Sequence, residues 1–196
     1  MSYSATSRIR AHLPSTQQWG ELELEQSYSA PRSLQFQAFQ FAGDKFVKTN
    51  VIARFLQSEL DYVQKDDSVR TALTTSNYEF STKGSTMVDG RRVHVFRVKP
   101  RHKYVGLFKG RIYLDAATGT LVRAEGYMVK SPSFFIKRIE FVEDYADFGP
   151  FTFRIRLHSS ALTRIVGAAI LDVEQGNYQC VTTSLGYFAG QGICRQ

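Results

Sequence analysis

The stretch FTFRIRLH, residues 151–158, does most to decide the fold. Apolar and polar side chains alternate along it, and the apolar ones are Phe151, Phe153, Ile155 and Leu157. A period of two is typical of a β-strand that packs one face against a core and exposes the other. Residues 20–28 alternate in the same way, with Leu22 and Leu24 opposite glutamates. Such half-polar strands favour an antiparallel sheet over a buried parallel one.

More strands follow from alternation and from turn residues. The predicted strands are 34–38, 93–98, 112–114, 121–127, 134–142 and 169–173. The first is followed by a bulge before Phe39 and Phe41, and the second follows the Asp89-Gly90 turn. The third and fourth are joined by a loop that ends at Gly119.

One segment has helical spacing instead. Its apolar residues are Val51, Ile52, Phe55, Leu56, Leu60 and Val63, preceded by the capping candidates Thr49 and Asn50. This spacing predicts an amphipathic helix of about four turns. A weaker helical turn is expected over residues 67–73. Strands, one helix and then more strands exclude βαβ alternation. The sequence therefore predicts a mainly β (α+β) fold in which one curved antiparallel sheet carries a helix on one face.

Composition limits the function classes. The chain has 196 residues, a net charge of +7, fifteen Phe and ten Tyr, which suits one soluble domain with a large aromatic core. A basic chain suits nucleic acid, an anionic membrane surface or acidic small molecules. The densest basic cluster spans residues 91–103, but Pro100 within it favours a solvated connection over a nucleic-acid platform. We therefore expect no nucleic-acid partner, and an anionic membrane surface is kept as an alternative partner for this cluster.

Catalytic and metal motifs are absent from the sequence. It has no GxSxG, HExxH, CxxC or DxDxDG pattern. His158 and Ser159 are adjacent, so on a strand they point to opposite faces. No catalytic residue, metal site or cofactor is predicted. Cys180 and Cys194 are compatible with a disulfide or with two free thiols.

The surplus of apolar side chains leaves two arrangements open. One helix covers only part of a sheet whose face carries Phe36, Phe135, Phe151 and Phe153. Either the sheet curls over itself around a solid aromatic core, or a concave apolar groove remains. A groove of this kind is a default site for an apolar ligand.

A series of motifs in the middle of the chain resembles one group of bacterial proteins. The motifs are YEF (78–80), VDGRR (88–92), VFRVKP (95–100), GRIYLD (110–115), TGTLVRAEG (118–126), KSPSFFIK (130–137), FVEDY (141–145) and FGPF (148–151). YSAT (3–6) and the helix at 51–60 fit as well. The group is the outer-membrane lipoprotein-sorting, or LolA-like, superfamily. The resemblance spans roughly residues 3–180, and it assigns no individual binding residue of this sequence.

The resemblance implies an incomplete β-barrel whose concave face, covered by a helix and loops, holds acyl chains or another lipid. It implies a periplasmic or otherwise exported protein without its signal peptide in this sequence. On that basis we expect a half-barrel domain over residues 1–180 and a C-terminal tail over 181–196. In the exported setting we also expect Cys180 and Cys194 to be bridged.

The leading hypothesis is a non-enzymatic carrier or sensor that binds a lipid or other apolar small molecule, in lipoprotein or lipid trafficking. Strand parity and the helix face give its predicted ligand-binding residues: Leu24, Phe36, Phe55, Leu56, Phe135, Ile139, Phe151, Phe153 and Ile155. One alternative is an envelope regulator or interaction module that docks on a membrane or envelope-protein partner through residues 91–103. The other is an enzyme that uses the groove with Glu125, Asp144 or His158 as proton carriers.

Overall fold

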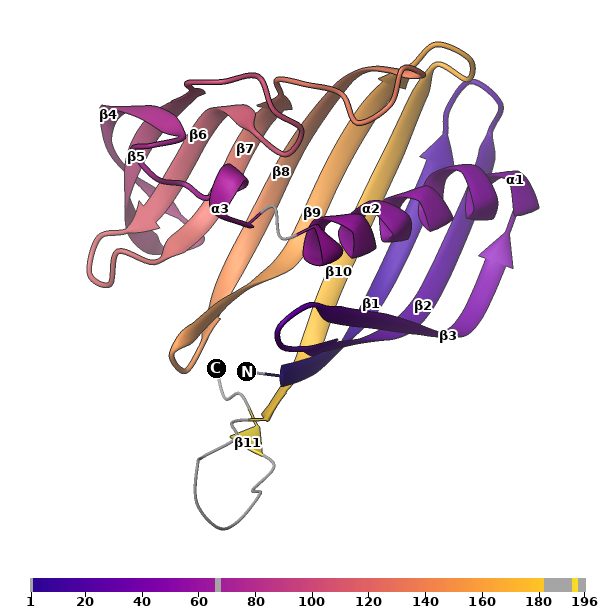
Figure 1. The fold of residues 1–196 in the computed structure, drawn as a ribbon, viewed down its shortest axis with the longest axis horizontal. Helices are drawn as coiled ribbons and strands as arrows, with labels where there is room; N and C mark the ends of the chain where they lie inside the picture. The colour runs from indigo at the N-terminus through magenta and orange to yellow at the C-terminus, as the bar shows by residue number, and fades with distance from the viewer. Residues whose placement is uncertain (1, 66–67, 182–191, 194–196) are drawn as a thin grey trace.

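The computed structural model describes residues 2–65, 68–181 and 192–193. It contains a single antiparallel sheet in the order β3-β2-β1-β10-β9-β8-β7-β6-β5-β4, with β11 paired to β10 (Figure 1). The sheet is strongly curved and does not close, because β3 and β4 are its two edges. The predicted fold class, an incomplete barrel with a helix on its concave face, is confirmed.

The strands are β1 (Ser2–Leu13), β2 (Gln18–Ser29), β3 (Ser33–Gly43), β4 (Tyr78–Val88), β5 (Arg91–Pro100), β6 (Phe108–Asp115), β7 (Leu121–Met128), β8 (Ile136–Phe148), β9 (Phe151–Thr163), β10 (Ala168–Val181) and β11 (Gly192–Ile193). The helical segments are α1 (Lys45–Val47), the π-helical η1 (Lys48–Ile52), α2 (Ala53–Gln64) and α3 (Ser68–Thr71).

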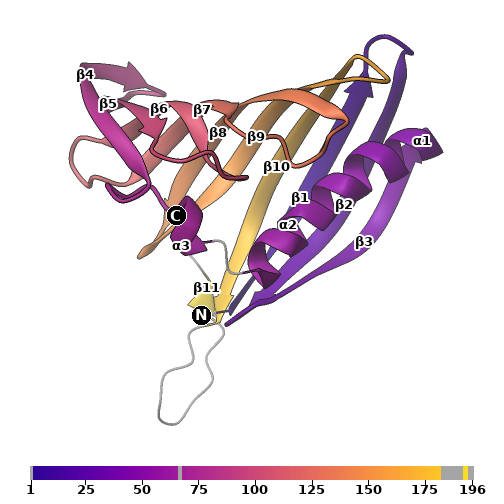
Figure 2. The same cartoon turned by 45° about the horizontal axis from the view of Figure 1, so that its top comes forward.

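The helix crosses the concave face diagonally (Figure 2). α1, η1 and α2 follow one another without a gap, so the helix begins at Lys45, earlier than the sequence predicted. Asp44, its N-cap, accepts a hydrogen bond from the Trp19 backbone N–H at 3.0 Å and thereby ties the helix to β2. The predicted caps Thr49 and Asn50 are wrong, because both lie inside η1. Asn50 instead donates to the Phe46 carbonyl oxygen, one turn back.

Two glycines allow β6 and β7 to approach closely. Gly110 and Gly126 are paired across these strands. A Cβ on Gly110 would collide with the Glu125 carbonyl oxygen, and one on Gly126 would collide with the Lys109 carbonyl oxygen. Only glycine leaves room for this approach.

The main core lies between the helix and the concave face. Ile9, Leu13, Leu24 and Ile52 are almost completely buried there. A second cluster on β1, β8 and β10 is built around Tyr178, Phe148 and Ala5. The burial pattern places the first half of the helix firmly on the sheet, since Val47 and Ile52 are its fully buried residues.

Strand β9 differs from the expected regular alternation. Its pairing with β8 shifts between Asp144↔Arg156 and Tyr145↔Arg154, so Ile155 is an extra residue on β9. A bulge of this kind changes which side chains share a face. The single apolar face expected from Phe151 to Leu157 is therefore interrupted, and Arg154 turns toward the helix.

The predicted tail over 181–196 lies almost entirely outside the described residues. Cys180 on β10 is buried and disulfide-bonded. Cys194, the other cysteine of the chain, lies outside the described residues, so its pairing stays a prediction.

Candidate functional site

A cavity of about 820 Å³ lies between α2 and the concave face of the sheet. Its floor is formed by β8, β9 and β10, where Phe141, Ser159 and Leu171 follow one another in register across the three strands. Its walls come from α2, from the segment around α3 and from the connections after β5 and β7. The aromatic and aliphatic lining residues include Phe55, Tyr62, Leu73, Tyr78, Tyr104, Phe108, Met128 and Ile139.

The helix changes character where it passes over this cavity. α2 has no fully buried residue, although its sequence is amphipathic. Phe55, Leu56 and Leu60 are only half-buried there. An apolar helix stripe is normally buried against a partner layer. In α2, Phe55 and Leu56 still pack against the main core, and Phe55 and Tyr62 also line the cavity.

A polar network joins the helix to the cavity floor. Arg154 lies at its centre with an 18% exposed side chain, and its Nη2 is 2.9 Å from Glu59 Oε2 on α2. Its Nη1 is 3.0 Å from Glu143 Oε1 on β8. Tyr145 donates to the second oxygen of Glu143 at 2.7 Å. One arginine is thus shared by two carboxylates, and Glu59, at 34% side-chain exposure, keeps contact with solvent.

This environment shifts the pKa values of several groups. Burial alone would lower the pKa of the Arg154 guanidinium, but the carboxylates of Glu59 and Glu143 raise it above its ordinary value. Burial, and then the Glu143 charge, raise the pKa of Tyr145 well above its ordinary value. Arg154 is therefore charged and Tyr145 neutral over the physiological range.

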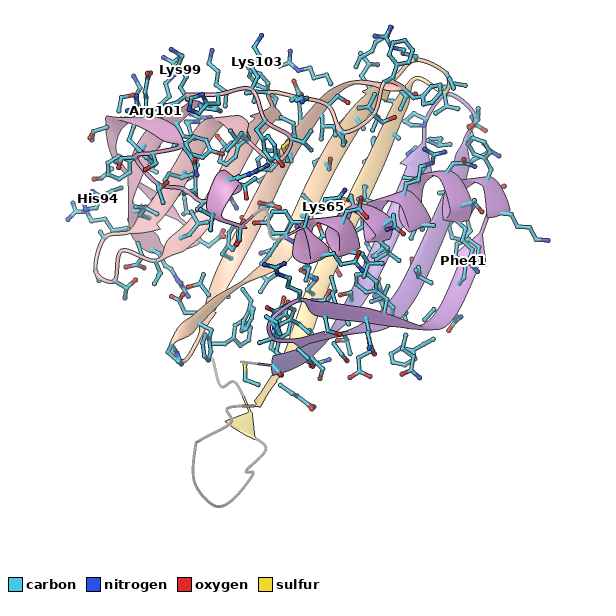
Figure 3. All side chains as sticks on the ribbon, viewed as in Figure 1. Phe41, Lys65, His94, Lys99, Arg101 and Lys103 are labelled. Atoms are coloured by element: carbon cyan, nitrogen blue, oxygen red, sulfur yellow. The ribbon has the colours of Figure 1, made fainter. Side chains whose placement is uncertain are left out.

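Elsewhere in the cavity wall, the charged side chains are Asp61, Lys65 and Lys130. Asp61 and Lys65 form an ion pair at 2.8 Å, and Lys65 marks the end of α2 at the centre of the sheet (Figure 3). Lys130 has no hydrogen-bond or ion-pair partner within the described part of the chain. Its ammonium group is free to meet the anionic end of a ligand.

A second hollow, of about 930 Å³, lies on the other face of the same strands. Ser160 and His158 line it, whereas their neighbours Ser159 and Leu157 line the cavity under α2. Its walls are mainly polar and charged, with Lys83, Arg97, Lys109, Arg111, Glu125 and Glu140 among them. Because its lining is the less apolar, the cavity under α2 is the better site for an apolar ligand.

The chain is similar in fold to several solved structures. A putative outer membrane lipoprotein-sorting protein domain from Vibrio parahaemolyticus is 12% identical, with a TM-score of 0.46 and coverage of 94% of this chain and 87% of that one. A LolA superfamily protein from Nitrosomonas europaea is 11% identical, with a TM-score of 0.41 and coverage of 93% and 87%. MucB in the Pseudomonas aeruginosa MucA/MucB complex is 12% identical, with a TM-score of 0.27 and coverage of 89% and 87%.

These likenesses concern the fold alone. No protein-family model and no curated protein sequence matches the chain. Two of these structures carry the LolA or lipoprotein-sorting name of the group that the sequence motifs resemble.

The nine residues predicted to bind a ligand are divided among several places. Phe55 and Ile139 line the cavity. Leu24 is buried in the main core, and Phe36 and Leu56 pack against that core. Phe153 and Ile155 belong to the second cluster, and Phe151 contacts Phe153 with ring centroids 6.2 Å apart. Phe135 is 51% exposed on the connection before β8. Their roles in binding stay a prediction.

The proton carriers of the enzyme alternative lie away from the cavity. Glu125 is paired with Arg111 and accepts a hydrogen bond from Tyr113. Asp144 is paired with Arg123 at 2.6 Å. His158 Nδ1 is 2.7 Å from Asp172 Oδ1, and both side chains are half exposed. None of the three is among the cavity's lining residues.

No group of three or more His, Cys, Asp or Glu side chains that could hold a metal ion occurs within residues 2–65, 68–181 and 192–193. Over the same residues, no helix is both long and apolar enough to cross a membrane.

Sequence reasoning missed Arg154 and its two carboxylates. In a regular strand Arg154 would lie opposite Phe153 and Ile155, on the solvent face. The bulge at Ile155 reverses this, and no local residue pattern marks it. Sequence reasoning also missed Ser159, Tyr62 and Phe108 as cavity residues. These side chains come together only because the sheet curves beneath the helix.

Proposed function

We propose that this protein binds a single apolar chain, such as a lipid acyl chain, in the cavity under α2 and serves as a carrier for it. One observation supports this most strongly. The part of the amphipathic helix that lies over the cavity, α2, has no fully buried residue, and aromatic and aliphatic side chains surround the polar network on the facing surface. An apolar ligand would complete this interface.

The size and chemistry of the cavity fit that ligand class. Its volume, about 820 Å³, lies within the range of about 300–1,000 Å³ typical of small-molecule sites. Its central cation, Arg154, is already paired with two carboxylates, so it offers little to an anionic ligand head. Lys130 supplies one cation for a carboxylate or phosphate head.

The setting we propose is an oxidising, extracytoplasmic compartment. The disulfide at Cys180 supports it, because structural disulfides persist mainly outside the cytosol. A carrier there would move lipids or lipid-modified proteins between membranes.

Two neighbouring serines provide a matched test. Ser159 lines the cavity and Ser160 lines the hollow on the opposite face. Ser159→Phe should fill the cavity and reduce binding of a fluorescent fatty acid at least tenfold, since it removes space that the chain occupies. Ser160→Phe adds the same side chain to the other face and should bind normally. Equal binding by both variants, with both folded by circular dichroism, would contradict the proposal.

Native mass spectrometry gives an independent measurement. The purified protein should carry a co-purified adduct of acyl-chain mass that is lost on denaturation. The Ser159→Phe protein, purified in parallel, should lack this adduct. An adduct that persists in this variant would place the ligand elsewhere.

A further inference from the structure

Four strand connections meet at one end of the sheet. In an antiparallel sheet, alternate connections lie at the same end. Here these are residues 14–17, 101–107, 129–135 and 164–167, which join β1–β2, β5–β6, β7–β8 and β9–β10. They form the upper edge in Figure 1. We call these four connections the basic rim.

The basic rim has a one-sided composition. It contains Arg101, Lys103, Lys130 and Arg164, together with His102, and no Asp or Glu. Lys103 and Arg101 project from this edge in Figure 3. Lys103 and Lys130 have no carboxylate partner among the described residues, and Arg101 lies 3.6 Å from Glu79. Lys103 and Lys130 are therefore positive charges of the rim that no described carboxylate neutralises, whereas Arg101 is paired.

Large apolar side chains are exposed at the same end. Phe134 is 77% exposed, Ile165 is 74% exposed and Phe135 is 51% exposed. Trp19, just after the first connection, is 50% exposed. Scattered apolar residues on a surface are ordinary, but several at one end beside unpaired cations indicate a contact surface.

These exposed residues are held in place. The Arg164 backbone N–H donates to the Phe135 carbonyl oxygen at 2.9 Å. The Arg164 Nε donates to the Phe134 carbonyl oxygen at 2.9 Å, and its guanidinium lies 4.7 Å from the centre of the Phe134 ring. The β7–β8 and β9–β10 connections therefore form one structured projection, with apolar tips and a cation between them.

The opposite end of the sheet provides an internal comparison. Its connections, residues 30–32, 89–90, 116–120 and 149–150, contain one Arg, one Asp and no large apolar side chain. The rim connections are longer, at four to seven residues against two to five, but length alone does not require basic or large apolar side chains. The apolar and basic residues of the rim need an explanation that is specific to that end.

We propose that the basic rim docks on an anionic lipid bilayer, with Phe134, Phe135 and Ile165 inserted at the interface and the cations against the headgroups. Aromatic and aliphatic tips flanked by Lys and Arg favour the boundary between headgroups and acyl chains. The absence of Asp and Glu from the rim fits a uniformly negative surface better than the mixed charges of a typical protein partner.

Docking of the rim is inferred from the rim residues themselves, and it adds to the proposed function a membrane from which the carrier would take its ligand. Val105, Lys130 and Pro132 belong both to the rim and to the cavity lining. A bilayer bound at the rim would therefore lie next to the cavity, so an acyl chain would have a short path between them.

Vesicle binding by the full chain tests the proposal. The probes are vesicles of phosphatidylcholine alone and of phosphatidylcholine mixed with phosphatidylglycerol. Trp19, the single Trp, reports docking by a blue shift of its fluorescence, and co-sedimentation gives the affinity. The protein should bind the mixed vesicles and release them as salt is raised. Equal binding to the two vesicle types would overturn the proposal. Failure to bind the mixed vesicles would also overturn it, and failure to bind vesicles of either type would favour a protein as the partner of the rim.

Matched variants locate the surface. Each cation removed should weaken binding about fivefold, so Lys103→Ala with Lys130→Ala should weaken it about twenty-five-fold. Arg91→Ala with Arg92→Ala removes the same charge at the opposite end and should have little effect. Phe134→Ser with Ile165→Ser should weaken binding at least tenfold, whereas Met87→Ser, exposed near the opposite end, should not. Equal losses from the variants of the two ends would overturn the assignment to the rim.

The two proposals fail separately. Phe134 and Ile165 do not line the cavity, so Phe134→Ser with Ile165→Ser should still take up fluorescent fatty acid from solution. Ser159→Phe should lose that uptake and still bind anionic vesicles. Loss of vesicle binding in Ser159→Phe would show that vesicles are recognised through the cavity, which would overturn docking by the rim.

Discussion

Arg154 on β9 and Glu59 on α2 lie 95 residues apart in the chain, and their side chains meet with Nη2 and Oε2 separated by 2.9 Å. This ion pair attaches the helix to the sheet over the cavity, where α2 buries no apolar residue. The helix is thus held by its fully buried residues Val47 and Ile52 in the first half, and by the partly buried Phe55 and Leu56 together with this ion pair in the second. A helix held in this way can cover a ligand without filling the ligand's space.

Removing the central cation should destabilise the protein strongly. Arg154→Ala leaves Glu59 and Glu143 without their cation, at 34% and 19% side-chain exposure. We expect the free energy of unfolding to fall by about 3 kcal/mol, the lower end for a broken buried pair, since Glu59 keeps some solvent. The midpoint of urea unfolding measures this.

The neighbouring arginine is a matched control for that substitution. Arg156 pairs with Asp144 at 3.6 Å, but its side chain is 60% exposed. Arg156→Ala should therefore cost about 1 kcal/mol or less. Equal losses for the two arginines would show that the contact beneath α2 is no stronger than a surface ion pair.

Gly110→Ala should strain the sheet where β6 meets β7. The added methyl group would collide with the backbone at Glu125, so the strands must separate, at a cost of about 1–3 kcal/mol or more. Gly176 on β10 is the control, because a Cβ there meets no atom within 4 Å. Gly176→Ala should leave stability unchanged or raise it by up to about 1 kcal/mol. Thermal unfolding distinguishes the two, and a harmless Gly110→Ala would contradict the close approach.

Stability should fall in alkali because of tyrosines around Arg154. Burial raises the pKa of Tyr3, Tyr145 and Tyr178 above the ordinary value of 10.0. Above that pH the folded state holds protons that the unfolded state has lost, so unfolding is favoured as pH rises. Below about pH 10 this contribution is fully present.

A phenylalanine variant isolates one of these tyrosines. In Tyr145→Phe the fall in unfolding free energy should be shallower by about 1.4 kcal/mol per pH unit above pH 10, because one titrating group is gone. At neutral pH the variant loses about 1 kcal/mol with its hydrogen bond to Glu143. Urea unfolding between about pH 8 and 11 measures both effects. An unchanged alkaline slope would contradict the raised pKa of Tyr145.

Phe153→Asp should unfold the protein rather than empty the cavity. Phe153 stacks on Tyr178 with ring centroids 4.4 Å apart and contacts Tyr3 at 5.0 Å. An aspartate would remove this packing and place a carboxylate among aromatic rings, at about 3 kcal/mol or more. Phe153→Leu keeps an apolar side chain, so it should fold and bind fluorescent fatty acid normally. Selective loss of binding in the folded leucine variant would place Phe153 in the ligand site.

Local residue patterns were enough to predict most strands and the existence of one helix. The Asp89-Gly90 turn, the loop ending at Gly119 and the bulge near Phe39 all occur where the sequence places them. These features depend on the conformational preferences of neighbouring residues, so they are visible in the sequence. The helix start was wrong because Asp44 is fixed by its contact with Trp19, far away in the chain.

The candidate site was much less accessible to sequence reasoning. The helix face identified Phe55, and strand alternation identified Ile139, as cavity residues. The extra residue Ile155 on β9, however, turns Arg154 toward the cavity and places Phe153 and Leu157 in different clusters. A one-residue shift reverses every later side chain on a strand.

The sequence by itself determined that this protein is a mainly β fold with one amphipathic helix and a surplus of aromatic residues, because periodicity and turn chemistry act between near neighbours. The tertiary structure alone decided that a cavity remains under α2, that Arg154 and Glu59 span it, and that basic and apolar residues from several connections gather at one end. Those outcomes depend on the curvature and register of the sheet, which are set by contacts between residues far apart in the chain.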